Sequence, residues 1–290
     1  MKKRMARGKK SRYRAGGHRW GIRIVCFVCL VSILACVKIW QEDVPQVKEA
    51  QNSVKATDDT LLSDAVVPLT SIKDIDAGTL IQQESLNLEQ ISMYFTVQEI
   101  DEDIFLYING KSYTENNNIG LQDLRYLKVL HYNYDHEIQV GELIVNEKIA
   151  EDCRNIFQEL FAVEYEIQSM YLLDRFWVGN GVDSDTASIE NNNTSAFNYR
   201  VVPGTDHLSN HARGCAIDLN PLQNPYVKYK KDGTFDKYYK DMEKYIDRSC
   251  GEAHMITHED PAYQIFTKYG FTWGGDWNSS KDYQHFEKQC

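Results

Sequence analysis

Hydrophobic and polar positions divide the chain into an N-terminal part and a folded part. Residues 24–40 are mostly apolar and carry a single charged residue, Lys38. Their number approaches the roughly 20 residues that a transmembrane helix needs. Residues 41–93 are polar and acidic with little periodicity, which is typical of a flexible stalk. Regular periodicity begins near Tyr94, so we expect a folded domain over residues 94–290.

Within residues 94–290 some segments have the hydrophobic period of strands and others that of helices, so we expect a domain that contains both. Strands are expected over residues 105–108, 124–132 and 167–173, and helices over residues 146–161, 236–250 and 261–269. Residues 179–193 are polar and are expected to form a long loop. Gly270 stands where the glycine that follows a helix C-terminus is expected.

Charge is distributed unevenly along the chain. The net charge is −10, but residues 1–40 hold eleven Lys and Arg and no acidic residue, which leaves the other 250 residues with 21 basic and 42 acidic side chains. Basic residues before an apolar segment and acidic ones after it favour a cytoplasmic N-terminus. We therefore expect a basic cytoplasmic tail over residues 1–23, a single-pass anchor over residues 24–40 in the cell membrane, and an extracellular domain.

A basic arm that binds nucleic acid is the alternative for residues 1–23. It would not explain the apolar segment that follows, and the acidic remainder of the chain has little to neutralise phosphates. We therefore expect no nucleic-acid partner. No small-x-small cleavage site follows the apolar segment, which favours an uncleaved anchor. Residues 33–36 loosely match a lipoprotein box, so lipidation of Cys36 stays open.

The stretch SNHARGCAID, from Ser209 to Asp218, contains the first candidate metal ligands. His211 can bind a metal through a neutral imidazole nitrogen and Asp218 through a carboxylate oxygen. The seven-residue spacing is enough for a turn between two strands. Gly214 would allow the close backbone approach that such a turn needs. Taken alone, the same pattern also fits a surface hairpin.

A second motif near the C-terminus completes a candidate metal site. Asp282 and His285 follow the sequence WGGDW at residues 273–277. His285 would be the third ligand, and three protein ligands plus water are typical of a catalytic zinc. Zinc lowers the pKa of its bound water to about 7, and Asp282 could accept the proton as a general base. The alternative for Asp282 is an ordinary surface residue in a loop.

The other histidines and the cysteines give weaker signals. His254 and His258 lie four residues apart but lack the glutamate of an HExxH zinc motif, so we expect them, like His207, at the surface. The four cysteines that follow residue 40 include no CxxC pair and allow three disulfide connectivities. At Cys215 we expect a buried, inert thiol.

Four segments together resemble a known family. They are NTSAFNYR at 193–200, SNHARGCAIDLNP at 209–221, WGGDW at 273–277 and DYQHF at 282–286. These segments resemble the VanY-type zinc D-alanyl-D-alanine carboxypeptidases, which belong to the LAS metallopeptidases together with phage L-alanyl-D-glutamate endopeptidases and D-Ala-D-Ala dipeptidases. The resemblance covers about residues 95–290. It implies the α+β class and the LAS or Hedgehog-like fold, a small antiparallel central sheet with flanking helices.

The resemblance also implies roles for individual residues. One Zn²⁺ ion would be held by three ligands, His211, Asp218 and His285. Asp282 would be the catalytic base. Arg200 would stabilise the substrate carbonyl as it becomes an oxyanion, and Ser209 would contact the substrate peptide.

The implied function is a membrane-anchored zinc metallopeptidase, expected as a monomer, that hydrolyses the peptide stems of peptidoglycan. D-Alanyl-D-alanine carboxypeptidase activity, by Asp-assisted attack of zinc-bound water, is favoured. Asp282 stands where several relatives have glutamate and is closer to the endopeptidase branch, so L-alanyl-D-glutamate endopeptidase is the alternative. A non-catalytic zinc module that recognises the wall is an alternative of another class. Asp282 argues against it, because a structural zinc site needs no base.

Overall fold

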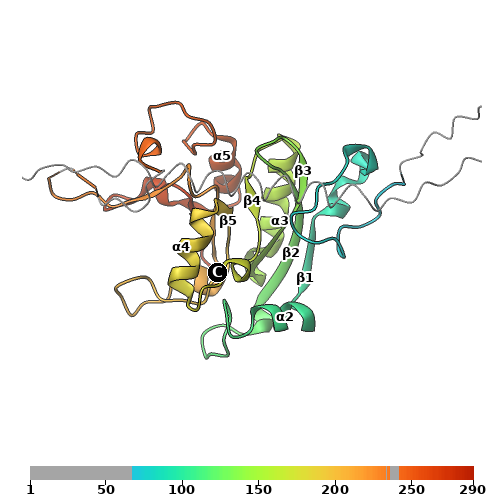
Figure 1. Ribbon diagram of the computed structural model, residues 1–290, viewed down its shortest axis with the longest axis horizontal. Coiled ribbons are helices and arrows are strands. Elements are labelled where there is room, and N and C mark those ends of the chain that lie inside the picture. Colours follow the sequence, from blue (N-terminus) through green and yellow to red (C-terminus); the bar gives the residue numbers. More distant parts are fainter. Residues whose placement is uncertain (1–66, 233, 236–241) are drawn as a thin grey trace, which may run out of the picture. The chain divides into compact units, whose positions relative to one another are not determined.

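The longest strands form one antiparallel sheet in the order β1 (Thr96–Glu99), β2 (Leu124–Tyr132), β3 (Ile138–Asn146). They belong to a computed structural model that describes residues 67–232, 234–235 and 242–290. β2 and β3 are a hairpin paired over their full length. Figure 1 shows the three strands side by side, with helix α3 (Glu147–Ala162) against them. The prediction of a strand over 124–132 is confirmed.

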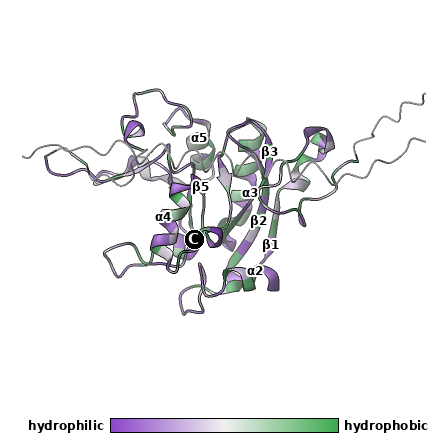
Figure 2. Ribbon diagram, in the orientation of Figure 1, coloured by the Kyte–Doolittle hydropathy of each residue, from purple (hydrophilic) through white to green (hydrophobic). Residues whose placement is uncertain are grey.

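Helix α3 begins directly after β3, where the Asn146 side chain accepts a hydrogen bond from the Lys148 backbone N–H. Its apolar residues recur at helical spacing and are buried on one face: Ile149, Cys153, Ile156, Phe157 and Leu160. Hydrophobic residues recur along β2, β3 and α3 in Figure 2. The helix predicted over residues 146–161 is confirmed to within one residue.

A second antiparallel sheet is built from short strands in the order β6 (Ala216–Asp218), β10 (His285–Glu287), β8 (Thr272–Trp273). Two pairs lie beside these sheets: the antiparallel pair β7 (Tyr226–Val227) and β9 (Lys281–Asp282), and the parallel pair β4 (Ser169–Met170) and β5 (Asn193–Thr194). With the helices, these small sheets confirm the α+β class.

The remaining helices are α2 (Glu102–Ile108), α4 (Gly181–Glu190) and α5 (Pro261–Lys268). The described residues also contain 3₁₀ turns, which are η1 (Gln83–Ser85), η2 (Leu88–Tyr94), η3 (Leu121–Asp123), η4 (Leu173–Phe176), η5 (His211–Arg213), η6 (Glu243–Tyr245) and η7 (Gly274–Asp276). Helix α5 is the helix predicted over residues 261–269. It begins at an Asp260 cap, and Gly270, with a φ of 81°, follows its end as predicted.

Two predicted elements are wrong because local caps outweigh the residue pattern. Residues 105–108 belong to α2 and not to a strand, since the Asp101 side chain accepts from the Ile104 N–H and starts a helix. Residues 179–193 are not a loop but contain α4, which begins at Asn180. The buried residues of α4 are the serines Ser184 and Ser188, so the helix has no apolar face to reveal it.

Two further predictions hold only in part. The strand expected over residues 167–173 is reduced to the two residues of β4. Of the helix expected over residues 236–250, residues 236–241 lie outside the described part of the chain. Residues 242–250 contain only the short turn η6.

Residues 67–93, which the sequence assigned to the stalk, pack against the first sheet. Ile72 is fully buried, and the Gly78 N–H and the Ile81 N–H donate to backbone carbonyls of β3. The described fold therefore begins earlier than Tyr94. The predicted tail, the anchor and residues 41–66 of the predicted stalk lie outside the described residues. Among the residues that are described, no helix has the length and apolar character needed to cross a membrane.

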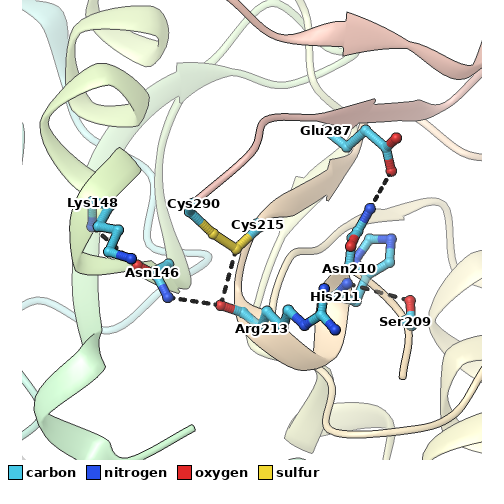
Figure 3. Close-up of a disulfide and its surroundings, with 9 residues drawn as sticks. All are labelled: Asn146, Lys148, Ser209, Asn210, His211, Arg213, Cys215, Glu287 and Cys290. Atoms are coloured by element: carbon cyan, nitrogen blue, oxygen red, sulfur yellow. Dashed lines mark hydrogen bonds between the residues drawn. A yellow bond between two sulfur atoms is a disulfide. The ribbon is translucent and has the colours of Figure 1, made fainter. Parts of the chain in front are cut away.

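A disulfide joins Cys215, which directly precedes β6, to Cys290, after the end of β10 (Figure 3). The expectation of a free buried thiol at Cys215 is therefore wrong. The thiol reaches its partner because β6 and β10 are antiparallel neighbours, which brings their two ends together. Of the other cysteines that the structure describes, Cys153 is buried and Cys250 exposed, and both are free.

Removing this disulfide should destabilise the protein. The bond closes a loop with a sequence separation of 75 residues, for which loop-closure entropy predicts a loss of about 4 kcal/mol in the free energy of unfolding. Cys290→Ser should show this loss in denaturant unfolding, and reductant should reproduce it in the unmodified chain. Cys250→Ser is the matched control. Equal unfolding midpoints for Cys290→Ser and the unmodified chain would contradict the prediction.

Candidate active site

Backbone pairing brings together two of the residues that the sequence predicted as metal ligands. His285, the first residue of β10, lies directly across from Asp218, the last residue of β6. His211 opens the turn η5, and Gly214 closes that turn with a φ of 69°. A Cβ at Gly214 would lie 2.6 Å from the backbone nitrogen of Asn146. The prediction that this glycine permits a close backbone approach is therefore confirmed.

The three side chains converge on one point and are all buried. The Nε2 atom of His211 lies 3.2 Å from Nδ1 of His285 and 3.3 Å from Oδ2 of Asp218. Nδ1 of His285 lies 2.9 Å from Oδ1 of Asp218. In the described part of the chain, these atoms form the group of potential metal ligands, all within 4.8 Å of one another.

Each histidine is held by its other ring nitrogen. Nδ1 of His211 donates to the backbone carbonyl of Ala196 at 2.6 Å. Nε2 of His285 lies 3.0 Å from Oε2 of Glu287. The same carboxylate oxygen accepts from the side-chain amide of Asn210 at 2.6 Å (Figure 3). Acceptors placed in this way leave the inward nitrogens free to bind a metal.

The donor set fits a zinc ion. Ligand atoms about 2.0–2.1 Å from a tetrahedral zinc lie about 3.3 Å from one another, and the separations of 2.9–3.3 Å between the three side chains match. Burial raises the pKa of Asp218, but His211 and His285 outweigh burial and hold it well below its usual range. The carboxylate is therefore charged, and a cation can replace the protons shared among these side chains.

Burial and hydrogen bonding act in opposite directions on His285. Burial lowers the pKa of its imidazole, but the hydrogen bonds to Asp218 and Glu287 raise it to about 10. The site thus attracts positive charge, as a proton or as a metal ion.

Asp282 lies beside the cluster, on β9, which pairs with Tyr226 of β7. A Cβ at Gly274 would come within 2.8 Å of Asp282 Cβ and 3.2 Å of His285 Cβ, so the WGGDW turn packs directly on both residues. Oδ1 of Asp282 is buried and has no hydrogen-bond partner among the described residues. Burial, together with the charge of Asp218, raises the pKa of Asp282 to about 7. A carboxylate of that kind can take up a proton near neutral pH.

Arg200 and Ser209 lie close together in the chain that leads into the site. The Ser209 N–H donates to the Arg200 carbonyl at 3.1 Å. The Ser209 hydroxyl accepts from the His211 N–H at 3.2 Å and so supports the turn that carries this histidine. The guanidinium of Arg200 donates through Nη2 to Oδ2 of Asp185 at 2.7 Å.

Sequence reasoning missed several residues at this site. Glu287 had a readable signal, because residues two apart on a strand share a face and His285 starts β10. Asp185 had none, since α4 was not expected. Trp277, half-buried with its ring 5.3 Å from the His285 ring, also borders the cluster.

The other histidines lie outside the cluster. His207 is exposed. His258 is exposed and pairs with Asp276. His254 is only partly exposed because its ring stacks on Tyr134, with the centroids 3.7 Å apart.

Comparison with known protein families gives a match in the C-terminal part of the chain. Residues 203–288 match the family model described as D-alanyl-D-alanine carboxypeptidase. No curated protein and no solved structure matches the chain. The matched segment contains the three clustered side chains and Asp282. This match to residues 203–288 supports the resemblance to the VanY-type D-alanyl-D-alanine carboxypeptidases.

Proposed function

We propose that the protein is a zinc peptidase that cleaves the peptide stems of bacterial peptidoglycan, and that it acts as a D-alanyl-D-alanine carboxypeptidase. The observation that carries the proposal is the convergence of His211, Asp218 and His285 beside the unpartnered carboxylate of Asp282. Two imidazoles and a carboxylate are a zinc donor set that leaves a position for water. A structural zinc site would have no use for the nearby carboxylate.

The residues of the site would have separate roles in catalysis. His211, Asp218 and His285 would hold one Zn²⁺, which supplies Lewis acidity and makes water a stronger acid. Oδ1 of Asp282, free of other partners, would take the proton from the attacking water and pass it to the leaving amine. Arg200 would donate to the oxygen of the scissile carbonyl as negative charge develops there.

Two features bear on which bond is cleaved. The description of the matching family favours the terminal D-Ala-D-Ala bond. The aspartate at position 282, in place of the glutamate found in several relatives, favours the L-Ala-D-Glu bond. We place the carboxypeptidase first because the family match covers the motifs of the site itself.

We also propose a cellular location and a fold family for the peptidase. The basic residues 1–23 and the apolar residues 24–40 support a membrane anchor with the peptidase outside the cell. The arrangement of small sheets and flanking helices is consistent with the LAS or Hedgehog-like fold. We also propose that the protein binds stem peptides as a monomer and, because residues 41–290 are acidic, that it binds no nucleic acid.

The deciding experiment is a product assay. The purified full-length chain, loaded with zinc, is incubated with stem pentapeptides, and the products are identified by mass spectrometry. Loss of one terminal alanine would support the carboxypeptidase. Cleavage between L-Ala and D-Glu would support the endopeptidase instead. Intact peptides at full zinc occupancy would contradict both and favour a non-catalytic zinc module.

Glu287 should tune zinc affinity without binding the metal. Its carboxylate accepts from His285 at 3.0 Å, and loss of such a partner costs about 10–100-fold in metal affinity. Glu287→Ala should show a loss of this size in competition with a chromogenic chelator, and Glu287→Gln a smaller one, since its amide oxygen still accepts. Glu89→Ala, at an exposed glutamate on η2, is the control. Unchanged affinity in Glu287→Ala would contradict the prediction.

A further inference from the structure

Arg200 is held from one side by helix α4. Its guanidinium Nη2 donates to Asp185 Oδ2 at 2.7 Å, and the two side chains are only 11% and 19% exposed. Gly181, at the start of α4, packs on Arg200 so closely that a Cβ there would lie 3.2 Å from Arg200 Cβ. The helix thus contacts Arg200 through both backbone and side chain.

The side chain and backbone of Asn198 link α4 to the metal cluster. The Asn198 side chain donates to the Gly181 carbonyl at 2.9 Å, and the Asn198 N–H donates to the His211 carbonyl at 3.1 Å. Asn198 therefore connects the start of α4 to the turn that carries His211. Burial raises the pKa of Asp185. The charge of Asp218 raises this pKa further, whereas Arg200 and His211 lower it, and the pKa is raised overall.

Arg200 keeps hydrogen-bonding capacity after it has paired with Asp185. Its Nε is buried and has no partner among the described residues. A guanidinium has five N–H donors in a rigid plane, so fixing Nη2 also fixes the direction of the others. Removal of Asp185 would leave a buried positive charge without its counter-ion, free to turn towards the carboxylates of the cluster.

We propose that Asp185 is a positioning residue, which orients the Arg200 guanidinium towards the substrate oxygen at the metal site. The inference rests on the proposed function, because it assigns Arg200 to the developing oxyanion. It adds to that function a residue outside the segment matched by the family model. Helix α4 thereby supplies, through Asp185, the residue that positions Arg200.

The main test compares substitutions on the same helix in the full-length, zinc-loaded chain. Asp185→Asn should lower kcat for stem-peptide hydrolysis by about 10–100-fold, the cost of a misplaced catalytic group. KM should change less than about threefold and zinc content should stay the same, because the metal ligands are untouched. Asp183→Asn, at an exposed aspartate two residues earlier, should keep full kcat.

A second experiment distinguishes a positioning role of Asp185 from a purely structural one. Arg200→Ala should be rescued in part by added guanidinium, which can bind to the carboxylate of Asp185. The double variant Arg200→Ala, Asp185→Asn should have the kcat of Arg200→Ala without guanidinium and should not be rescued. If Asp185→Asn alone fails to fold, this experiment still tests the proposal. The double variant removes both charges of the pair and so leaves no buried unpaired charge there.

The outcomes are distinguishable. Full kcat in Asp185→Asn, or equal guanidinium rescue with and without Asp185, would overturn the positioning role while leaving the peptidase intact. If the unmodified chain cleaves no stem peptide, the proposed function itself fails, and this inference fails with it.

Discussion

Asp282→Asn should greatly reduce the turnover of stem peptides while zinc stays bound. Asparagine has nearly the shape of aspartate but cannot accept a proton, so the loss should be about 10²–10⁴-fold in kcat, the usual contribution of a general base. Zinc should be retained because Asp282 is not one of the three side chains whose ligand atoms converge. Steady-state kinetics and metal analysis of the same sample would measure both quantities.

The control for this variant is Asp276→Asn. Asp276 lies in the same WGGDW segment but is exposed and paired with His258. It should keep full activity. If Asp282→Asn retained the activity of the unmodified chain, the base would have to be another residue.

His285→Ala should lose zinc and activity together. In the proposed site the imidazole would be one of three protein ligands, so the loss in zinc affinity should exceed the roughly 10–100-fold expected for an outer partner such as Glu287. The side chain also accounts for one of the two contacts of Asp218 within the cluster. Titration with zinc against a chelator, followed by the peptide assay, would measure the effect.

Folding must be checked in the same variant, because His285 opens a strand of the second sheet. Circular dichroism should remain unchanged, since Phe286 and not His285 provides the apolar contact of this strand, stacking 4.2 Å from the Phe266 ring. His207→Ala, at an exposed position, is the matched control. Full zinc affinity in His285→Ala would contradict the assignment of the third ligand.

The sequence predicted the cluster better than its surroundings. His211, Asp218 and His285 could be found because few residue types bind zinc and the motifs have fixed spacing. The strand β2 and helix α3 could be found because their apolar residues are periodic. Helix α4 could not, since it buries serines and depends on the Asn180 cap.

Contacts between paired strands also could not be predicted from the sequence. Nothing local indicates that Cys215 meets Cys290, because the contact depends on the pairing of β6 with β10. The Arg200–Asp185 pair likewise joins residues from a loop and an unexpected helix. Local sequence patterns therefore predict secondary-structure elements and the residues of a motif. Which side chains orient those residues depends on tertiary contacts.

The position of the disulfide has a consequence for metal uptake. Asp218 and His285 are 67 residues apart in the chain, and bringing two such ligands together costs loop-closure entropy that grows slowly with length. The Cys215–Cys290 bond joins the same two strands, so oxidation restricts that loop before any ion arrives. A metal ion would then meet ligands that are already close together, and little of its binding free energy would be needed to close the loop.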